Sequence, residues 1–219
     1  PLNQFYNNLF VTRAPAGTMA EILHHLLSGL AHLQTHRIVH RDIKTANVVV
    51  SQGSNPKCQI IDFGLAIYHN PTDQLLTEPE GTKAFMAPER FNGGEYTYNS
   101  DVYSAGLIVK SLLECISYSN DVFNLMAERK ADLTVVNSNN YPPAFVNCIN
   151  ACLIADRKRR EDALGIINIF EDSNVFRTAL PMIPMDRDME LPATPPPRQK
   201  PVGRKHGVDL PHPSSRRGA

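Results

Sequence analysis

The chain has 219 residues, and its 22 basic and 22 acidic residues give a formal net charge of zero. This balance supplies no electrostatic argument for binding nucleic acid or a membrane surface. No apolar run reaches the roughly 18 residues that span a bilayer, and no signal-peptide pattern opens the chain. We therefore expect an intracellular protein of the cytoplasm or nucleus, with neither nucleic acid nor a membrane among its partners.

Four cysteines stand without any CxxC spacing, which fits a reducing compartment. Cys148 and Cys152 lie four residues apart in an apolar stretch, where one helix face could bring two thiols together. Two buried structural cysteines are the favoured interpretation, because free cysteine is commonly buried.

The predicted elements run in the order helix, hairpin, loop and further helices. Apolar residues recur at helical spacing over 19–34, which predicts an amphipathic helix. The β-prone runs 48–50 and 59–61 flank a turn rich in Gly, Ser, Asn and Pro, so they predict a small hairpin. The stretch 102–113 is apolar nearly all round and predicts a buried helix. Shorter helices are predicted over 121–129, 144–154 and 160–170, and an irregular segment over 65–85.

The composition changes past residue 177. Residues 178–219 are rich in proline and basic side chains and carry few large apolar groups, so they cannot bury enough surface to offset the entropy of ordering. We predict a folded domain over 1–177 and a disordered tail after it. The segment Thr194–Arg198 matches a proline-rich ligand of SH3 or WW domains or a site for a proline-directed kinase, but a plain solubilising tail is the favoured interpretation.

Three motifs follow one another in the middle of the chain. The loop His40–Asn47 places an acid, a cation and an amide at fixed steps. Asp62-Phe63-Gly64 begins fifteen residues after that loop, and Ala87-Pro88-Glu89 closes the segment that follows. Phosphoryl transfer needs an oriented hydroxyl, a magnesium site and a cation near the moving phosphoryl group. These residue types can supply all three.

The three motifs together resemble the eukaryotic protein kinases, over roughly residues 9–172. The resemblance implies an α+β, protein-kinase-like fold, and the order of elements matches the mainly α-helical C-terminal lobe with its short β-hairpin. It also implies a transferase that moves the γ-phosphate of ATP to serine or threonine hydroxyls of protein substrates, since Lys44 is typical of the serine/threonine kinases. The cofactors implied are ATP and Mg²⁺.

The resemblance assigns roles to individual residues. Asp42 would accept or orient the substrate hydroxyl proton, and Lys44 would stabilise charge on the γ-phosphate. Asn47 and Asp62 would hold Mg²⁺ through hard oxygen ligands. Val49 would pack beneath the adenine ring. The alternative for Asp42, a turn or helix-cap aspartate, is disfavoured because three other residues are in register with it.

Further residues resemble the structural framework of a kinase. His40 and Phe63 match the lower half of the hydrophobic spine that joins the two lobes, and Gly64 completes the motif of Phe63. Asp101 matches the aspartate that caps the backbone of the catalytic loop. An N-cap for the helix that follows Asp101 is a compatible alternative.

Two more contacts are implied by the resemblance. Glu89 is expected to pair with a buried arginine near the end of the domain. Arg160 is the candidate, and Arg159 is a near-equal rival on spacing. Thr82 is expected to hydrogen-bond the catalytic aspartate and lysine rather than to serve as a regulatory phosphosite.

Arg41, beside the catalytic aspartate, needs an anionic partner from the activation segment, here residues 62–89, in kinases of this type. The usual position of the phosphorylated residue holds Glu78, with Thr77 beside it. We hypothesise that Glu78 supplies this charge constitutively, so that activity does not depend on phosphorylation of the loop. A carboxylate carries one charge against about −1.5 to −2 for a phosphate, so the replacement would be partial.

No glycine-rich loop, strand lysine or helix glutamate precedes the catalytic loop in this sequence. We therefore expect a fragment from which the N-terminal lobe of the kinase is absent. The alternative is a kinase-derived scaffold or decoy without activity, which the intact catalytic residues argue against. The filler Thr45-Ala46 and the compact lobe faintly resemble herpesvirus-type kinases, an origin that would place the protein in a host cell.

Overall fold

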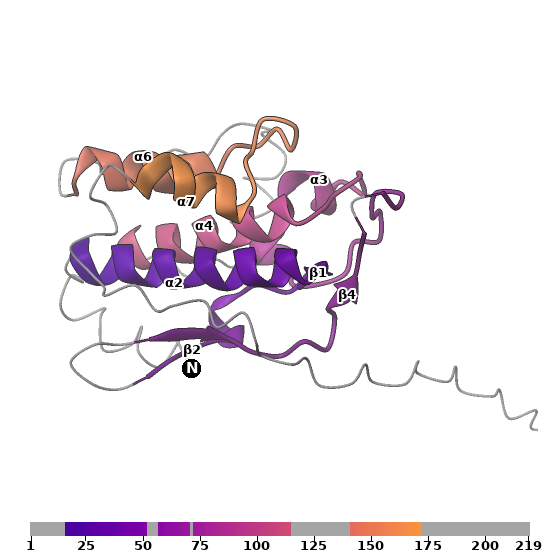
Figure 1. Ribbon diagram of the computed structural model, residues 1–219, viewed down its shortest axis with the longest axis horizontal. Coiled ribbons are helices and arrows are strands. Elements are labelled where there is room, and N and C mark those ends of the chain that lie inside the picture. Colours follow the sequence, from indigo (N-terminus) through magenta and orange to yellow (C-terminus); the bar gives the residue numbers. More distant parts are fainter. Residues whose placement is uncertain (1–15, 52–56, 71, 115–140, 172–219) are drawn as a thin grey trace, which may run out of the picture. The chain divides into compact units, whose positions relative to one another are not determined.

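The structure, a computed structural model, describes residues 16–51, 57–70, 72–114 and 141–171 (Figure 1). All of them belong to one compact unit of the chain, Pro1–Pro181. The helix predicted over 121–129, the tail after 177 and its proline-rich segment lie outside the described residues. The docking role of that segment stays a prediction.

Helices form most of this unit. The long ones are α2 (Ala16–Thr35), α4 (Asn99–Glu114), α6 (Pro143–Cys152) and α7 (Ala163–Glu171), and a short α3 covers Pro88–Phe91. Helix α2 packs against α4 and α7, and α4 also packs against α6 (Figure 1). The helices predicted over 19–34, 102–113 and 144–154 are confirmed, with ends moved by one to three residues. None of the described helices is both long enough and apolar enough to cross a bilayer.

The core lies where α2 meets the other helices. The buried face of α2 is made of apolar side chains that are at most 5% exposed: Met19, Ile22, Leu23, Leu26, Leu27 and Leu30. Burying one such side chain contributes about 1.5–3 kcal/mol. The apolar period in the sequence therefore predicts which face of α2 is buried in the core.

Helix α4 is buried on all sides between Val102 and Leu112, as the nearly all-round apolar character of this stretch predicts. A Cβ built at Gly106 would lie 2.8 Å from the Cβ of Cys152. Any side chain at Gly106 would push α4 and α6 apart, so the glycine permits their close approach.

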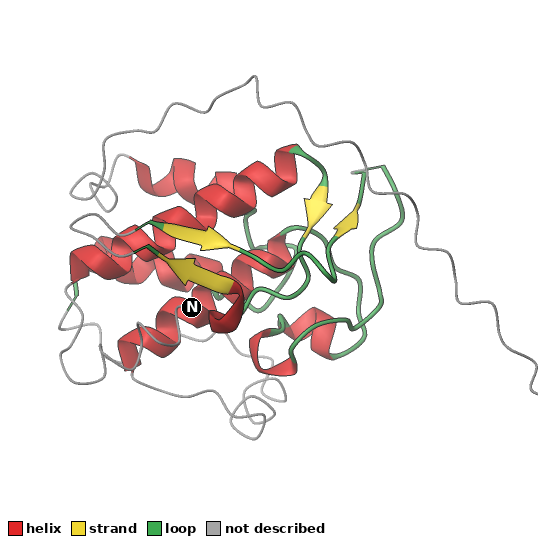
Figure 2. Cartoon of the chain, turned by 90° about the horizontal axis from the view of Figure 1, so that it is seen from below, coloured by secondary structure: helices red, strands yellow, loops and turns green. Residues whose placement is uncertain are grey.

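Two small antiparallel sheets accompany the helices in the part of the chain that the structure describes (Figure 2). Strand β2 (Val48–Val50) pairs with β3 (Cys58–Ile60), which confirms the predicted hairpin. Strand β1 (Ile38–Val39) pairs with β4 (Ile67–Tyr68). Strand β3 packs against α2, so the hairpin is anchored to the helical core.

Residues 65–85 are more regular than predicted. They contain β4 and the 3₁₀ turn η2 (Lys83–Phe85), and Leu76 forms a bridge with Tyr96. Strand β4 is only two residues long, and its partner β1 lies far from it in the sequence. No local period could have predicted it.

Helix α7 begins later than the helix predicted over 160–170. Asp162 Oδ1 accepts the backbone N–H of Gly165 at 2.8 Å, which is the contact of an N-cap residue. The helix therefore starts at Ala163. Arg160 precedes the cap and lies outside the helix, so the prediction that it is helical is wrong.

Cys148 and Cys152 are both buried and form no disulfide. Burial raises the pKa of both thiols, that of Cys152 to about 12. The prediction of two buried structural cysteines is confirmed.

Candidate active site

The loop from β1 to β2 holds Asp42 at the centre of a cluster of hydrogen bonds. Its Oδ1 accepts the backbone N–H of Thr82 at 2.9 Å and the hydroxyl of Thr82 at 2.7 Å. Its Oδ2 accepts from Lys44 Nζ at 2.7 Å and from Asn47 Nδ2 at 3.0 Å. Lys44 also donates to Thr82 Oγ1 at 3.0 Å, so the bonds predicted for Thr82 are present.

These donors keep Asp42 ionised. Burial alone would raise the pKa of its carboxyl, but the hydrogen bonds from Lys44 and Thr82 and the charge of Lys44 outweigh it and hold the pKa below its ordinary value. The carboxylate is therefore charged and fixed in position, as a group that orients a hydroxyl must be.

The same cluster aims the side chain of Asn47. The 3₁₀ turn η1 (Thr45–Asn47) brings it back to Asp42, where Nδ2 donates to the carbonyl oxygen at 2.9 Å as well as to the carboxylate. With the amide nitrogen engaged, the amide oxygen is the atom of this side chain that can act as a metal ligand. The carbonyl oxygen of Asn47 accepts the N–H of Ile61 at 2.9 Å. This bond ties Asn47 to the residue directly before Asp62.

Asp62 combines an exposed side chain with a left-handed backbone, at a φ of 63°. Its Oδ1 accepts the N–H of Gly64 at 3.2 Å. Positive φ is uncommon outside glycine, and residues held there gather at functional sites. The neighbouring ring of Phe63 meets the ring of His40 edge-on, with centroids 5.0 Å apart, so the predicted contact of these two rings is present.

His40 is held in one orientation and one tautomer. Its side chain is buried, Nδ1 lies 3.3 Å from the backbone nitrogen of Asp42, and Nε2 lies 3.2 Å from the carbonyl oxygen of Ile61. A backbone N–H can only donate and a carbonyl can only accept, so the ring proton is assigned to Nε2.

Asp101 supports the catalytic loop from inside α4. Its carboxylate accepts the backbone N–H of His40 at 2.7 Å and that of Arg41 at 3.1 Å. Arg41 has a φ of 69°, and these bonds hold it in that conformation. The predicted cap of the loop is present. The alternative of a helix N-cap is wrong, because α4 begins at Asn99 and Asp101 lies within its first turn.

Glu89 and Arg160 form the predicted ion pair. Two nitrogens of Arg160 reach the two carboxylate oxygens of Glu89 at 2.8 and 3.0 Å, a bidentate arrangement. The buried guanidinium also donates to the carbonyl oxygens of Asn99, Ile154 and Ala155 and lies over the ring of Tyr103. The rival Arg159 is exposed.

Arg41 directs its side chain at the activation segment. Its Nε donates to the carbonyl oxygen of Leu65 at 2.6 Å, and its Nη1 lies 3.5 Å from Oε2 of Glu78. The predicted contact with Glu78 is therefore present, although the Glu78 side chain is 76% exposed and water screens the pair. Thr77 is exposed beside it.

Known proteins resemble this chain over most of its length. The family model described as the protein kinase domain matches residues 2–169. This chain belongs to the protein kinase domain family. The helices and small sheets described above fit the kinase-like fold.

Relatives of this kinase domain include mitogen-activated protein kinase kinase 1 of Arabidopsis thaliana, 30% identical over 193 residues, which cover 77% of this chain and 52% of that protein. Mitogen-activated protein kinase kinase SIPKK of Nicotiana tabacum is 33% identical over 168 residues, 70% of this chain and 45% of that protein. Serine/threonine-protein kinase SMU1 of Mycosarcoma maydis is 30% identical over 179 residues, 78% of this chain and 24% of that protein.

The recognition of a eukaryotic-type serine/threonine protein kinase is thereby confirmed. The chain spans about half the length of these curated relatives or less. The herpesvirus likeness stays a prediction.

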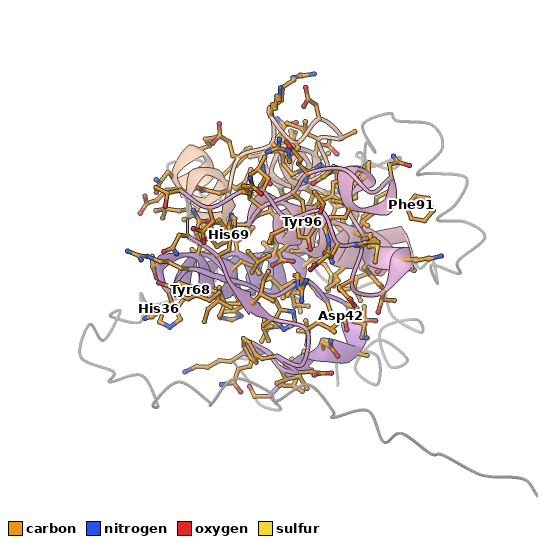
Figure 3. All side chains as sticks on the ribbon, turned by 90° about the vertical axis from the view of Figure 1, so that its right-hand side faces the viewer. His36, Asp42, Tyr68, His69, Phe91 and Tyr96 are labelled. Atoms are coloured by element: carbon orange, nitrogen blue, oxygen red, sulfur yellow. The ribbon has the colours of Figure 1, made fainter. Side chains whose placement is uncertain are left out.

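Two buried residues of this kinase domain escaped the sequence analysis, Arg90 and Tyr96. Arg90 is 1% exposed and Tyr96 is fully buried. Figure 3, which looks onto the side of β4 and α3, labels Tyr96 together with Asp42. The available signal in the sequence was the place of Arg90, a basic residue directly after Ala87-Pro88-Glu89.

Proposed function

We propose that this kinase domain transfers the γ-phosphate of ATP to serine or threonine hydroxyls of protein substrates. The observation that carries the proposal is the Asp42 cluster, in which one ionised carboxylate bonds Lys44, Asn47 and Thr82. A hydroxyl placed against it would find a proton acceptor and a cation one hydrogen bond apart. The relatives are named as protein kinases, which supports a protein as the acceptor.

Asp42 and Lys44 divide the chemistry between them. Because its pKa is lowered, Asp42 is a weak base at neutral pH. Its main role is therefore to hold the hydroxyl in line, and it receives the proton as the phosphoryl group is transferred. Lys44 Nζ lies 2.7 Å from Asp42 Oδ2, close enough to stabilise charge on the phosphoryl group that moves toward the hydroxyl. Thr82 ties the activation segment to both residues.

Asn47 and Asp62 would hold Mg²⁺. The ion prefers oxygen ligands and keeps several waters, so one amide oxygen and one carboxylate suit it, with phosphate oxygens as further ligands. Within the described ranges, no cluster of three or more His, Cys, Asp or Glu side chains could hold a metal without such help. When bound, Mg²⁺ neutralises phosphate charge. Val49, half-buried on β2, would pack beneath the adenine ring.

The test is transfer of radiolabelled γ-phosphate to dephosphorylated casein with Mg²⁺, using the protein that carries this chain. Asp42→Asn is expected to lower kcat by about 100-fold or more, with little change in KM for ATP. Asp73→Asn is the matched control, because Asp73 is an exposed carboxylate of the activation segment that bonds Asn70.

Two results would count against the proposal. No transfer by the unaltered protein would favour the inactive scaffold or decoy. Equal rates for the unaltered protein and Asp42→Asn would remove Asp42 from the mechanism.

A further inference from the structure

Arg90 lies on α3 and joins three parts of the active site. Its Nη2 donates to the carbonyl oxygen of Arg41 at 2.7 Å and to the carbonyl oxygen of Glu80. Its Nη1 lies 3.9 Å from Oδ1 of Asp101. One buried guanidinium therefore contacts the catalytic loop, the activation segment and α4 together.

The activation segment presses against the catalytic loop at the carbonyl that Arg90 binds. Gly81, between Glu80 and Thr82, has a φ of 111°, and a Cβ built there would lie 2.3 Å from the carbonyl oxygen of Arg41. The same Cβ would come within 3.1 Å of Arg90 Nη2. Glycine alone permits this approach. At this close approach Arg90 bonds one carbonyl oxygen of each segment, that of Arg41 and that of Glu80.

Tyr96 attaches the segment just before Gly81. Its ring lies beneath the guanidinium of Arg90, 4.8 Å from ring centroid to Cζ, and its hydroxyl donates to the carbonyl oxygen of Glu78 at 2.8 Å. Its backbone exchanges hydrogen bonds of 2.9 and 3.2 Å with Leu76. The backbone of 76–80 is thus bound by partners that are themselves buried.

We propose that Arg90 is a positioning residue of this active site, which fixes the backbone of Glu80 against that of Arg41 and so places Thr82 on Asp42. Arg90 acts two residues away from Thr82, through Gly81, and does not touch the reacting atoms. In this arrangement a buried cation bound to carbonyl oxygens orders the part of the activation segment that bonds Asp42. As a statement about phosphate transfer the inference rests on the proposed function, but the placement of Thr82 is measurable without it.

Hydrogen exchange at the amide of Thr82 tests this placement, since that amide donates to Asp42 at 2.9 Å. Arg90→Lys keeps a cation but loses the planar guanidinium, whose Nη2 bonds both carbonyl oxygens while its Nη1 faces Asp101. It is expected to speed exchange at Thr82 about tenfold, as loss of a hydrogen bond would. Amides of the α2 core are expected to exchange as before. An unchanged rate at Thr82 would overturn the inference.

Arg160→Lys is the matched control. Arg160 is also buried, and it also bonds backbone carbonyls and a carboxylate, but its partners are Glu89 and segments remote from Thr82. Its substitution is expected to lower Tm while exchange at Thr82 stays as it was. An equal rise at Thr82 in both variants would show a general loosening and would overturn the positioning role.

Tyr96→Phe serves if Arg90→Lys does not fold. It removes one hydroxyl and keeps the ring beneath Arg90, so it is expected to speed exchange over 76–80 by less than tenfold. Unchanged exchange rates at those amides would mean that the Tyr96 hydroxyl does not hold the segment, which would contradict the proposal.

Transfer to dephosphorylated casein separates this inference from the proposed function. Arg90→Lys is expected to raise KM for casein about tenfold and to lower kcat, with KM for ATP unchanged, because Thr82 bonds Asp42, the residue proposed to hold the substrate hydroxyl. A fall in kcat with both KM values unchanged would indicate only less folded protein and would overturn the positioning role. If the unaltered protein transfers no phosphate, the proposed function fails, and hydrogen exchange still decides where Arg90 places Thr82.

Discussion

The helical core and the catalytic loop are stabilised by different kinds of contact. In the core, α4 packs apolar side chains against both α2 and α6. In the loop, the backbone amides of His40 and Arg41 bond a carboxylate that lies 61 and 60 residues further along the chain. The carboxylate of Asp42 bonds Thr82, 40 residues away.

Core and loop therefore differ in which side chains can be substituted by others. Apolar side chains of similar volume replace one another at small cost, because packing depends on shape and not on particular atoms. A buried polar group needs its own partner, and removal of that partner leaves the group without a hydrogen bond. We therefore expect the loop to tolerate fewer substitutions than the core.

The largest loss of stability is expected for Asp101→Ala. It removes the acceptor of two backbone amides and leaves the charge of Arg90 buried without its ion pair, which costs about 3–5 kcal/mol. Asp101→Asn keeps one acceptor oxygen and is expected to cost less. Urea unfolding measures both. A loss for Asp101→Ala smaller than that for a core truncation would break the comparison.

Leu107 on α4 is the matching site in the core, fully buried among apolar neighbours. Leu107→Ala is expected to cost about 2–5 kcal/mol, through lost burial and the cavity left behind. Leu107→Met keeps the volume and is expected to cost less than about 1.5 kcal/mol. If both variants lost the same free energy of unfolding, the core would depend on particular side chains as strongly as the loop does.

Acid is expected to weaken the loop through Asp42. Its pKa is lowered in the folded protein, so the unfolded chain takes up the proton first. The contribution of Asp42 is complete above the ordinary carboxyl value of about 3.9 and is lost as the pH falls through the lowered pKa. The difference in free energy of unfolding between the unaltered chain and Asp42→Asn should therefore fall from about pH 5 toward pH 2. A constant difference would contradict this.

The smallest change in stability is expected for Glu78→Ala, at most about 1 kcal/mol, because the side chain is 76% exposed. If its charge replaces a phosphate beside Arg41, kcat should fall in this variant and stay unchanged in Thr77→Ala. Glu80→Ala controls for loss of a nearby exposed carboxylate. Full activity of Glu78→Ala together with an inactive Thr77→Ala would end the hypothesis.

What could be predicted from the sequence also differs between the helical core and the catalytic loop. Helix α2 follows from its local apolar period, the hairpin from β-propensity, and α4 from a run that is apolar nearly all round, because the chain itself marks the surface that each of them buries. The contacts Glu89–Arg160 and Asp101–His40 were predicted from motif resemblance, and no period reveals them. Their roles in catalysis stay predictions.

Arg90 and β4 escaped prediction for a physical reason. One partner of Arg90 is a carbonyl oxygen 49 residues away, and every residue carries such an oxygen. Strand β4 is likewise defined by pairing with a distant two-residue strand. The late start of α7 depends on the side-chain cap by Asp162, a contact that the apolar period of the residues after it does not reveal.

Cys148 and Cys152 make the opening of α6 measurable by chemistry. A buried thiol with a raised pKa holds almost no thiolate at neutral pH, so an alkylating reagent must wait until the helix opens. Cys58 on β3 is half-buried, and burial raises its pKa to about 12, so it reports on the hairpin in the same way. The order in which these thiols are alkylated would give the sequence of local unfolding in the unaltered protein, with no probe introduced.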